Sequence, residues 1–215
     1  MSDISKRSID RLSLYLHYLR DKKEQGIKDI SSVTIAGDMN INAVTVKKDL
    51  ARIAGQSGRP RIGFDVETLI HDIQTALGYN KLDNVVLVGV GQLGHVLLSY
   101  NGFAGYGLNI VAGFDTDAGK VGQIVCGKPV FHIDRLADVV SKYGVQMGII
   151  TVPKDFAQNA ADAMIAAGIR GLWNFAPTHI NIPENVVIKN EDLASSLAIL
   201  SNQIRSEEKK TSHGF

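Results

Sequence analysis

The segment that most constrains this chain spans residues 84–117, where two apolar runs flank a glycine-rich turn. Residues 85–88 are typical of a strand buried on both faces, and residues 108–114 form a second apolar run that leads into Asp115. Between them stands Gly89-Val90-Gly91-Gln92-Leu93-Gly94, which opens an amphipathic helix. This order of strand, glycines, helix, strand and acid predicts a doubly wound α/β domain that binds a dinucleotide.

Each glycine of the turn has a predicted role. Gly89 can form the tight turn after the strand, Gly91 lets the backbone approach a pyrophosphate, and Gly94 lets the helix lie against the sheet. The free amide groups at the helix start would face the anion. Asp115 is placed to meet the adenosine ribose hydroxyls and would repel a 2′-phosphate, which favours NAD(H) over NADP(H) despite the nearby Lys120. A related domain that binds another nucleotide such as coenzyme A, or nothing, is the alternative.

Composition limits the class of protein. With 45% hydrophobic and 21% charged residues, the 215-residue chain can bury a core as one large domain or two modest ones. It has no apolar run near the ~20 residues that span a bilayer and no secretion signal, so we expect a cytoplasmic protein without a membrane partner. The six histidines show no zinc-binding spacing. The one cysteine, Cys126, excludes an internal disulfide, and we expect it to be a small buried residue.

Charge is distributed unevenly along the chain. Residues 1–61 carry a net charge of +5, whereas the remainder carries −4. A basic front on an acidic body suggests a polyanionic partner for the front.

The basic front has the pattern of a helix-turn-helix. Helices are expected over residues 8–22 and over residues 42–53. Between them, a serine of Ser31-Ser32 can cap a second helix that ends near Asp38, with Asn40 in the left-handed conformation that can end a helix. The third helix would enter a major groove, and the turn-rich segment 55–64 after it would form the hairpin of a winged helix. The alternative is a three-helix bundle whose charges are merely solvated.

The predicted DNA contacts share polar or basic character, or a place at the start of the recognition helix. Thr45 is the polar candidate for reading a base, and the basic residues could engage phosphates or bases. The candidates are Ser31, Ser32, Asn42, Ala43, Thr45, Lys47, Lys48, Arg52, Arg59 and Arg61.

Strands and helices alternate through the rest of the chain, which predicts a parallel sheet with right-handed crossovers. We expect a winged-helix domain over residues 1–78, a Rossmann-type domain over 79–190, and a final helix with its tail over 191–215. Leu193, Leu197, Leu200 and Ile204 form a narrow stripe on that helix. The stripe covers its own domain or packs against another subunit.

The chain resembles the Rex family of redox-sensing transcriptional repressors over nearly its whole length. The shared features are Arg11-Leu12 with Tyr15, Ile30-Ser31-Ser32, Val46-Lys47-Lys48-Asp49-Leu50, Gly89 to Gly94, Leu97-Leu98-Ser99-Tyr100, Phe114-Asp115-Thr116-Asp117 with Lys120 and Gly122, Thr151-Val152-Pro153, and Asn174-Phe175-Ala176-Pro177. Two departures bear on DNA binding: Lys47 stands where the family commonly has arginine, and Asn40 where glycine is usual. A third concerns Leu193, which is aromatic in some relatives.

The resemblance implies a homodimeric repressor that binds double-stranded operator DNA and senses NADH/NAD. NAD, or no ligand, would permit operator binding, and NADH would release it. The final helix would swap across the dimer, and Asp192 would pair with Tyr100 in a way that depends on the bound nucleotide. The implied nucleotide contacts are Gly89, Val90, Gly91, Gln92, Leu93, Gly94, Asp115, Lys120, Thr151 and Pro153.

Two rival functions remain open at the level of sequence. An NAD-dependent dehydrogenase needs an acid or base beside its substrate, and no histidine stands at a motif spacing from an acidic partner. That class also has no evident use for a winged helix, so we expect no enzymatic activity. A DNA-binding regulator that senses another ligand, such as an acyl-coenzyme A, is the second rival.

Overall fold

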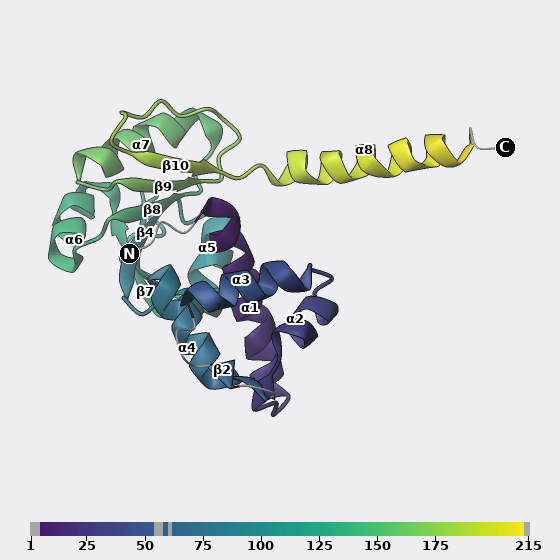
Figure 1. Ribbon diagram of the computed structural model, residues 1–215. Coiled ribbons are helices and arrows are strands. Elements are labelled where there is room, and N and C mark those ends of the chain that lie inside the picture. Colours follow the sequence, from purple (N-terminus) through teal and green to yellow (C-terminus); the bar gives the residue numbers. More distant parts are fainter. Residues whose placement is uncertain (1–4, 54–57, 60–61, 213–215) are drawn as a thin grey trace. The chain divides into compact units, whose positions relative to one another are not determined.

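The computed structural model describes residues 5–53, 58–59 and 62–212, which form two compact units (Figure 1). The N-terminal unit comprises Met1–Leu82 with Gly105–Gly107, and the sheet unit comprises Asp83–Ala104 with Leu108–Phe215. In the described part of the chain, no helix combines the length and apolarity needed to cross a membrane.

The described residues of the N-terminal unit form four helices and a small sheet. The helices are α1 (Lys6–Glu24), α2 (Ser32–Asp38), α3 (Ala43–Ile53) and α4 (Val66–Leu77). Capping side chains fix two helix starts: Ser31 Oγ accepts a hydrogen bond from the Thr34 N–H, and Asp65 Oδ1 accepts one from the Thr68 N–H. Asn40 has the expected left-handed φ of 52°, so the chain turns sharply between α2 and α3.

The wing expected after the third helix is present. Strands β1 (Asp29–Ile30), β2 (Gly58–Arg59) and β3 (Gly63–Asp65) form an antiparallel sheet in the order β1-β3-β2. Arg59 is exposed on β2, whereas Arg61 lies outside the described residues. The unit is therefore a winged helix-turn-helix rather than a plain three-helix bundle.

A seven-stranded sheet forms the centre of the sheet unit. Its order is β10-β9-β8-β4-β5-β7-β6, and only the β6 and β7 pair is antiparallel. The strands are β4 (Asp83–Val88), β5 (Leu108–Asp115), β6 (Ile124–Val125), β7 (Lys128–His132), β8 (Met147–Ile150), β9 (Gly171–Asn174) and β10 (Val187–Asn190). Taking the parallel strands in chain order, this is the Rossmann arrangement expected from the sequence.

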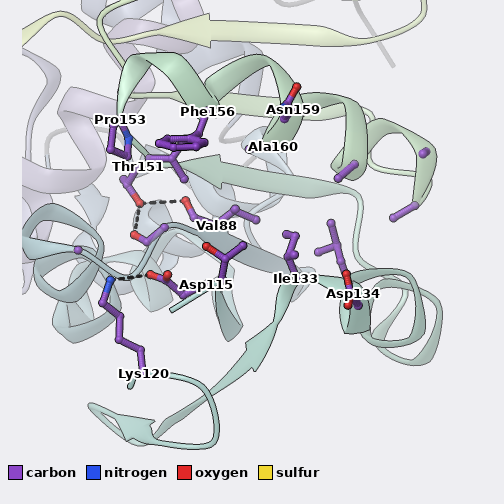
Figure 2. Close-up of a pocket in the computed structure, with 18 of the residues that line it drawn as sticks. Val88, Asp115, Lys120, Ile133, Asp134, Thr151, Pro153, Phe156, Asn159 and Ala160 are labelled. Atoms are coloured by element: carbon purple, nitrogen blue, oxygen red, sulfur yellow. Dashed lines mark hydrogen bonds and ion pairs between the residues drawn. The ribbon is translucent and has the colours of Figure 1, made fainter. Parts of the chain in front are cut away.

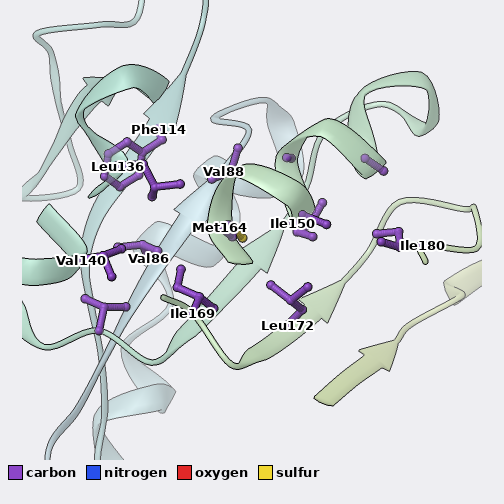
Figure 3. Close-up of a cluster of buried hydrophobic side chains, with 14 of the residues drawn as sticks. Val86, Val88, Phe114, Leu136, Val140, Ile150, Met164, Ile169, Leu172 and Ile180 are labelled. Atoms are coloured by element: carbon purple, nitrogen blue, oxygen red, sulfur yellow. The ribbon is translucent and has the colours of Figure 1, made fainter. Parts of the chain in front are cut away.

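Helices cover both faces of this sheet. On one face, α6 (Leu136–Tyr143) and α7 (Ala157–Ala166) bury a cluster that includes Val86, Phe114 and Met164 (Figure 3). On the other face, α5 (Gln92–Ser99) buries Leu98 against Leu87 and Ile110. Because successive residues of β4 point to opposite faces, Val86 and Leu87 belong to different clusters. The remaining helical segments are the 3-10 turns η1 (Asn101–Tyr106), η2 (Ile133–Arg135) and η3 (Lys154–Phe156), and the final helix α8 (Leu193–Ser212).

The expectation that Cys126 is buried was wrong. Cys126 is exposed at the turn between β6 and β7, with a left-handed φ of 50°. The apolar neighbours Val125 and Val130 suggested a strand interior, but the chain reverses at this position and turns the thiol to the surface.

Candidate functional site

The candidate nucleotide site lies at the carboxyl ends of two neighbouring parallel strands, β4 and β8. Crossovers leave β4 and β8 in opposite directions along the sheet, which makes the ends of these two strands its topological switch point. Gly89 follows β4 and Thr151 follows β8. Thr151 Oγ1 donates hydrogen bonds to Gly89 O at 2.7 Å and Val88 O at 3.2 Å (Figure 2). This hydroxyl therefore fixes the turn that leads into α5.

The three glycines of this turn do different work in the structure. Gly89 has a φ of +100°, and a Cβ there would lie 2.7 Å from Val152 Cγ1. A Cβ on Gly94 would meet the Gly89 carbonyl oxygen at 2.1 Å, so only glycine lets α5 approach the strand end. A Cβ on Gly91, by contrast, would meet nothing within 4 Å. Gly91 thus borders open space at the start of α5.

That open space suits a pyrophosphate. Gly91 caps α5 without a side-chain hydrogen bond, so the first amide groups of the helix are left for another acceptor. Free amides and the helix dipole both favour an anion at this end. The residues present therefore fit a dinucleotide, with Gly89 to Gly91 holding its phosphates.

Hydrogen bonds within the protein hold the Asp115 side chain in place at the end of β5. Its Oδ2 accepts hydrogen bonds from the Val90 N–H and from Lys120 Nζ, both at 2.9 Å, and its Oδ1 accepts one from the Asp117 N–H at 3.0 Å. Burial by itself would raise the pKa of Asp115, but the Asp117 and Val90 amides and the Lys120 ammonium outweigh it and lower that pKa. The Asp115 carboxylate stays ionised and its side chain is only 12% exposed.

A cavity of about 680 Å³ extends from this turn along α7 (Figure 2). Gly89, Gly91, Asp115, Lys120 and Thr151 line one part of it. The other part is largely apolar and is lined by Ile133, Leu136, Phe156, Ala160 and Ala163, among others. A polar end with free amides and an acid, joined to this apolar slot, can hold a ribose phosphate and a planar base.

The structure places the predicted nucleotide contacts in two groups. Gly89, Gly91, Asp115, Lys120, Thr151 and Pro153 line the cavity. Val90 acts through its N–H on Asp115, and Gln92, Leu93 and Gly94 form the first turn of α5. Direct nucleotide contact stays a prediction for all ten residues.

Sequence reasoning missed the apolar slot. Phe156 and Asn159 line it, with Ala160, Ala163 and Ala167 behind them. The signal was there: Ala160, Ala163 and Ala167 recur at helical spacing, and small side chains on one helix face leave room beside a sheet. Taken alone, the same stripe equally fits close packing between helix and sheet.

The predicted pair of Tyr100 and Asp192 is not seen within the chain. Tyr100 is 59% exposed and packs edge-on against Phe103, with ring centroids 5.0 Å apart. Asp192 Oδ1 accepts a hydrogen bond from the Ser195 N–H at 2.8 Å and so caps α8. Their pairing stays a prediction.

The candidate DNA interface is the exposed side of α3. Lys47, Lys48 and Arg52 are exposed there, and Thr45 is half-buried. Asn42 Oδ1 accepts hydrogen bonds from the Val44 N–H at 2.9 Å and the Thr45 N–H at 3.4 Å, which fixes the first turn of the helix. The other candidates also lie at the surface or near it: Ser31 and Ser32 are half-buried, and Ala43 and Arg59 are exposed.

A buried polar network anchors the opposite side of α3 to α1. Arg11 donates two hydrogen bonds to Asp49, from Nε to Oδ2 at 2.6 Å and from Nη2 to Oδ1 at 2.8 Å. Tyr15 Oη donates a third to Asp49 Oδ2 at 3.1 Å. Burial, followed by the charge of Asp49, raises the pKa of Tyr15 to about 12. Burial alone would raise the pKa of Asp49, but Arg11 and Tyr15 outweigh it and lower that pKa. The network fixes how α3 presents its basic residues.

Known protein families match the two parts of the chain separately. A family described as "Putative DNA-binding protein N-terminus" matches residues 3–51. A family described as "CoA binding domain" matches residues 80–178. The boundary between the two matches falls near the structural division at Leu82.

A winged helix-turn-helix joined to a doubly wound nucleotide site defines a class, the transcription regulators that carry a ligand-binding domain. The redox-sensing transcriptional repressor Rex of Bacteroides fragilis is 38% identical over 201 residues, which cover 94% of this chain and 91% of that protein. Rex of Treponema denticola is 39% identical over 193 residues, covering 90% and 91%. The chain belongs to the Rex family of redox-sensing transcriptional repressors.

Solved structures of RSP, which is described as a Rex-family repressor, agree with this assignment over the whole chain. The crystal structure of RSP in complex with β-NAD+ and operator DNA is similar at a TM-score of 0.86, with 29% sequence identity and full coverage of both chains. RSP in complex with β-NADH is similar at a TM-score of 0.83, with 29% identity and 99% coverage of each chain.

Proposed function

We propose that this chain is a DNA-binding repressor that senses the NADH/NAD ratio, binds its operator with NAD or without ligand, and is released by NADH. The observation that carries the proposal is the likeness to RSP, which has been solved both with β-NAD+ on operator DNA and with β-NADH. The open space at Gly91 and the exposed basic side of α3 also support the proposal, because such a function needs a nucleotide site and a DNA-binding surface.

The sensing step requires contacts that distinguish reduced from oxidised nicotinamide. The two rings differ in charge and planarity, and a ligand shifts an equilibrium only by its difference in affinity for the two states. A swing from mostly bound to mostly released requires up to ~5.5 kcal/mol of such difference. In our proposal Tyr100 and Asp192 take part in this discrimination, while Gly89 to Gly94, Asp115, Lys120, Thr151 and Pro153 hold the dinucleotide.

The proposed output is a change in the spacing of two recognition helices. Half-sites on DNA lie about one helical turn apart, ~34 Å, so two copies of α3 must be held at that spacing. A tilt between the copies removes the match and most of the specific binding. The proposal therefore requires a homodimer.

The final helix supports the dimer. Leu193, Leu197, Leu200 and Ile204 are each more than half exposed on α8, which is unusual for a regular leucine stripe. We propose that a second copy of the chain covers this stripe by exchange of α8. We also propose that the three parts of the chain span residues 1–78, 79–190 and 191–215. Leu197→Glu should convert the dimer to a monomer in size-exclusion chromatography with light scattering. Ile124→Glu, at an equally exposed site on β6, should leave the dimer intact.

We further propose that the chain has no enzymatic activity. It acts in the cytoplasm, where it meets its operator. In support, the relatives from Bacteroides fragilis and Treponema denticola are named as transcriptional repressors. Incubation with NADH or NAD and candidate substrates should give no change in absorbance at 340 nm.

One specific observation favours a second ligand. The matching family over residues 80–178 is described as a CoA binding domain, and coenzyme A shares the adenosine and pyrophosphate that the cavity suits. Isothermal titration with NADH, NAD, NADPH and coenzyme A separates the two ideas. We expect NADH to bind at least as tightly as NAD, and coenzyme A to bind weakly or not at all. Tight binding of coenzyme A with no NADH binding would replace the redox-sensing proposal.

The deciding experiment is a gel shift on a palindromic operator with NADH titrated against fixed NAD. The shifted fraction should fall as the NADH/NAD ratio rises, at constant total nucleotide. An operator complex that is insensitive to this ratio would end the proposal, even if both nucleotides bind.

A further inference from the structure

The junction between β10 and α8, residues 190–193, is tied to the neighbouring strand by side chains that the family resemblance did not mark. Trp173 on β9 donates a hydrogen bond from Nε1 to Glu191 Oε1 at 3.1 Å. Lys189 Nζ lies 2.8 Å from the same Glu191 oxygen. The Glu191 carboxyl is therefore held on two sides, with 28% of its side chain exposed.

A second set of hydrogen bonds holds the backbone of the junction. The Glu191 N–H donates to Asn174 O at 2.8 Å, and Asn174 Nδ2 donates to Asn190 Oδ1 at 2.9 Å. Asn174 is fully buried and also binds both backbone groups of Ala176. A buried amide with all these partners is a rigid anchor, so β9 dictates where the chain stands as it enters α8.

Aromatic rings connect this anchor to the far end of the nucleotide-binding helix. Trp173 lies edge-on to Phe103, with ring centroids 6.1 Å apart, and Phe103 lies edge-on to Tyr100 at 5.0 Å. Tyr100 directly follows α5, whose first turn borders the Gly91 space. The path from Tyr100 to Glu191 consists of neighbouring side chains within the sheet unit.

We propose that Trp173 and Glu191 are positioning residues that set the direction in which α8 leaves the sheet, and so couple the nucleotide site to operator binding. The coupling part of this inference rests on the proposed function. The positioning part rests on the contacts of the sheet unit alone.

Because α8 is long, a small change of direction at the junction moves its far end by a large distance. A helix of 20 residues is about 30 Å long, so a tilt of about 10° at its base displaces the far end by about 5 Å. Since the apolar stripe of α8 stays exposed among the residues that the structure describes, the direction of α8 decides how a second copy is held. Loss of one hydrogen bond at residue 191 can therefore move the far end of α8 by several ångströms.

The test uses substitutions that remove one element of the junction at a time. Trp173→Phe keeps a ring beside Phe103 but removes the N–H donor, and Glu191→Leu removes the acceptor. Glu191→Gln restores a side-chain oxygen acceptor without the charge. Lys189→Ala is the matched control, because it removes an exposed ion pair on the same carboxyl and leaves the indole hydrogen bond.

The functional measurement is the ratio of operator affinity with NAD to operator affinity with NADH. We expect Trp173→Phe and Glu191→Leu each to reduce this ratio by about fivefold, at the weak end of ordinary coupling factors, with unchanged NADH affinity of the free protein. The double variant should lose no more than either single one. Glu191→Gln and Lys189→Ala should retain the wild-type ratio.

Hydrogen exchange separates failure of this inference from failure of the proposed function. The amides of residues 191–197 should exchange faster in Trp173→Phe and Glu191→Leu than in the wild type, with or without nucleotide. If the wild type itself shows no NADH-dependent release, the proposed function fails and the exchange measurement still judges the positioning role. Wild-type exchange and a wild-type affinity ratio in both variants would overturn the inference, as would a loss in Glu191→Gln as large as in Glu191→Leu.

Discussion

Lys120 Nζ lies 2.9 Å from Asp115 Oδ2, so the acid at the end of β5 is paired with a cation inside the nucleotide cavity. The pair explains how one site can hold a carboxylate for ribose hydroxyls without leaving a buried charge unpaired. It also means that the predicted preference against a 2′-phosphate depends on both residues, because removal of the acid would free a cation.

Asp115→Ala should therefore weaken NADH binding by about tenfold or more, as expected for loss of hydrogen bonds to a charged group. NADPH binding should weaken less or improve, since the freed Lys120 can pair with the 2′-phosphate. Isothermal titration with both nucleotides measures the ratio. Operator binding without nucleotide should persist. An unchanged NADH/NADPH ratio would remove Asp115 from the site.

Gly91→Ala and Gly94→Ala should have opposite effects on folding and binding. A Cβ on Gly91 meets nothing within 4 Å, so the variant should keep the wild-type melting temperature while a methyl group occupies the pyrophosphate space and nucleotide binding is lost. A Cβ on Gly94 would lie 2.1 Å from Gly89 O, which should cost about 3 kcal/mol of stability. Thermal melts with and without NADH distinguish the two. Normal NADH binding by Gly91→Ala would place the phosphates elsewhere.

Arg11→Ala should destabilise the N-terminal unit by about 2 kcal/mol or more, because it leaves the buried Asp49 with one partner fewer. Denaturant titration followed by circular dichroism gives the free energy. Lys23→Ala, which breaks an exposed pair with Glu67, serves as the control and should change it little.

The same network predicts how stability depends on pH. The pKa of Asp49 is lowered in the folded protein, so its contribution is complete above the ordinary value of about 4 and is lost as pH falls through the lower, folded value. The wild type should therefore lose stability at acid pH more steeply than Asp49→Asn. Parallel slopes for the two proteins between pH 5 and pH 2 would contradict the assignment.

Lys48→Ala should abolish the operator shift without loss of nucleotide binding. For a phosphate contact, weakening should be similar on all DNA sequences, and the slope of log affinity against log salt should fall by about one.

Lys47→Arg tests base reading instead: if residue 47 faces a guanine, the arginine fork should tighten binding to that site by about 1–3 kcal/mol and leave other sites unchanged. Equal gains on every sequence would make Lys47 a phosphate contact.

The local elements of this protein follow from local sequence signals. Residues 84–117 predicted strand, turn, helix and strand, because apolar periodicity and glycine placement act over a few neighbouring residues. The helix-turn-helix and its wing were likewise visible from residues 8–64, including the left-handed Asn40. Cys126 was misplaced because an apolar neighbourhood does not reveal on which residue a hairpin turns.

Contacts between distant segments had to come from the tertiary structure. Nothing local joins Arg11 to Asp49, the Val90 N–H to Asp115, or Trp173 to Glu191, since each contact depends on how separate elements pack. The chain alone thus determined which elements form and where the glycines lie, because both are written in backbone preference and side-chain period. The fold decided which charges are paired, which alanines line a cavity and where α8 departs, because these depend on distances that only packing sets.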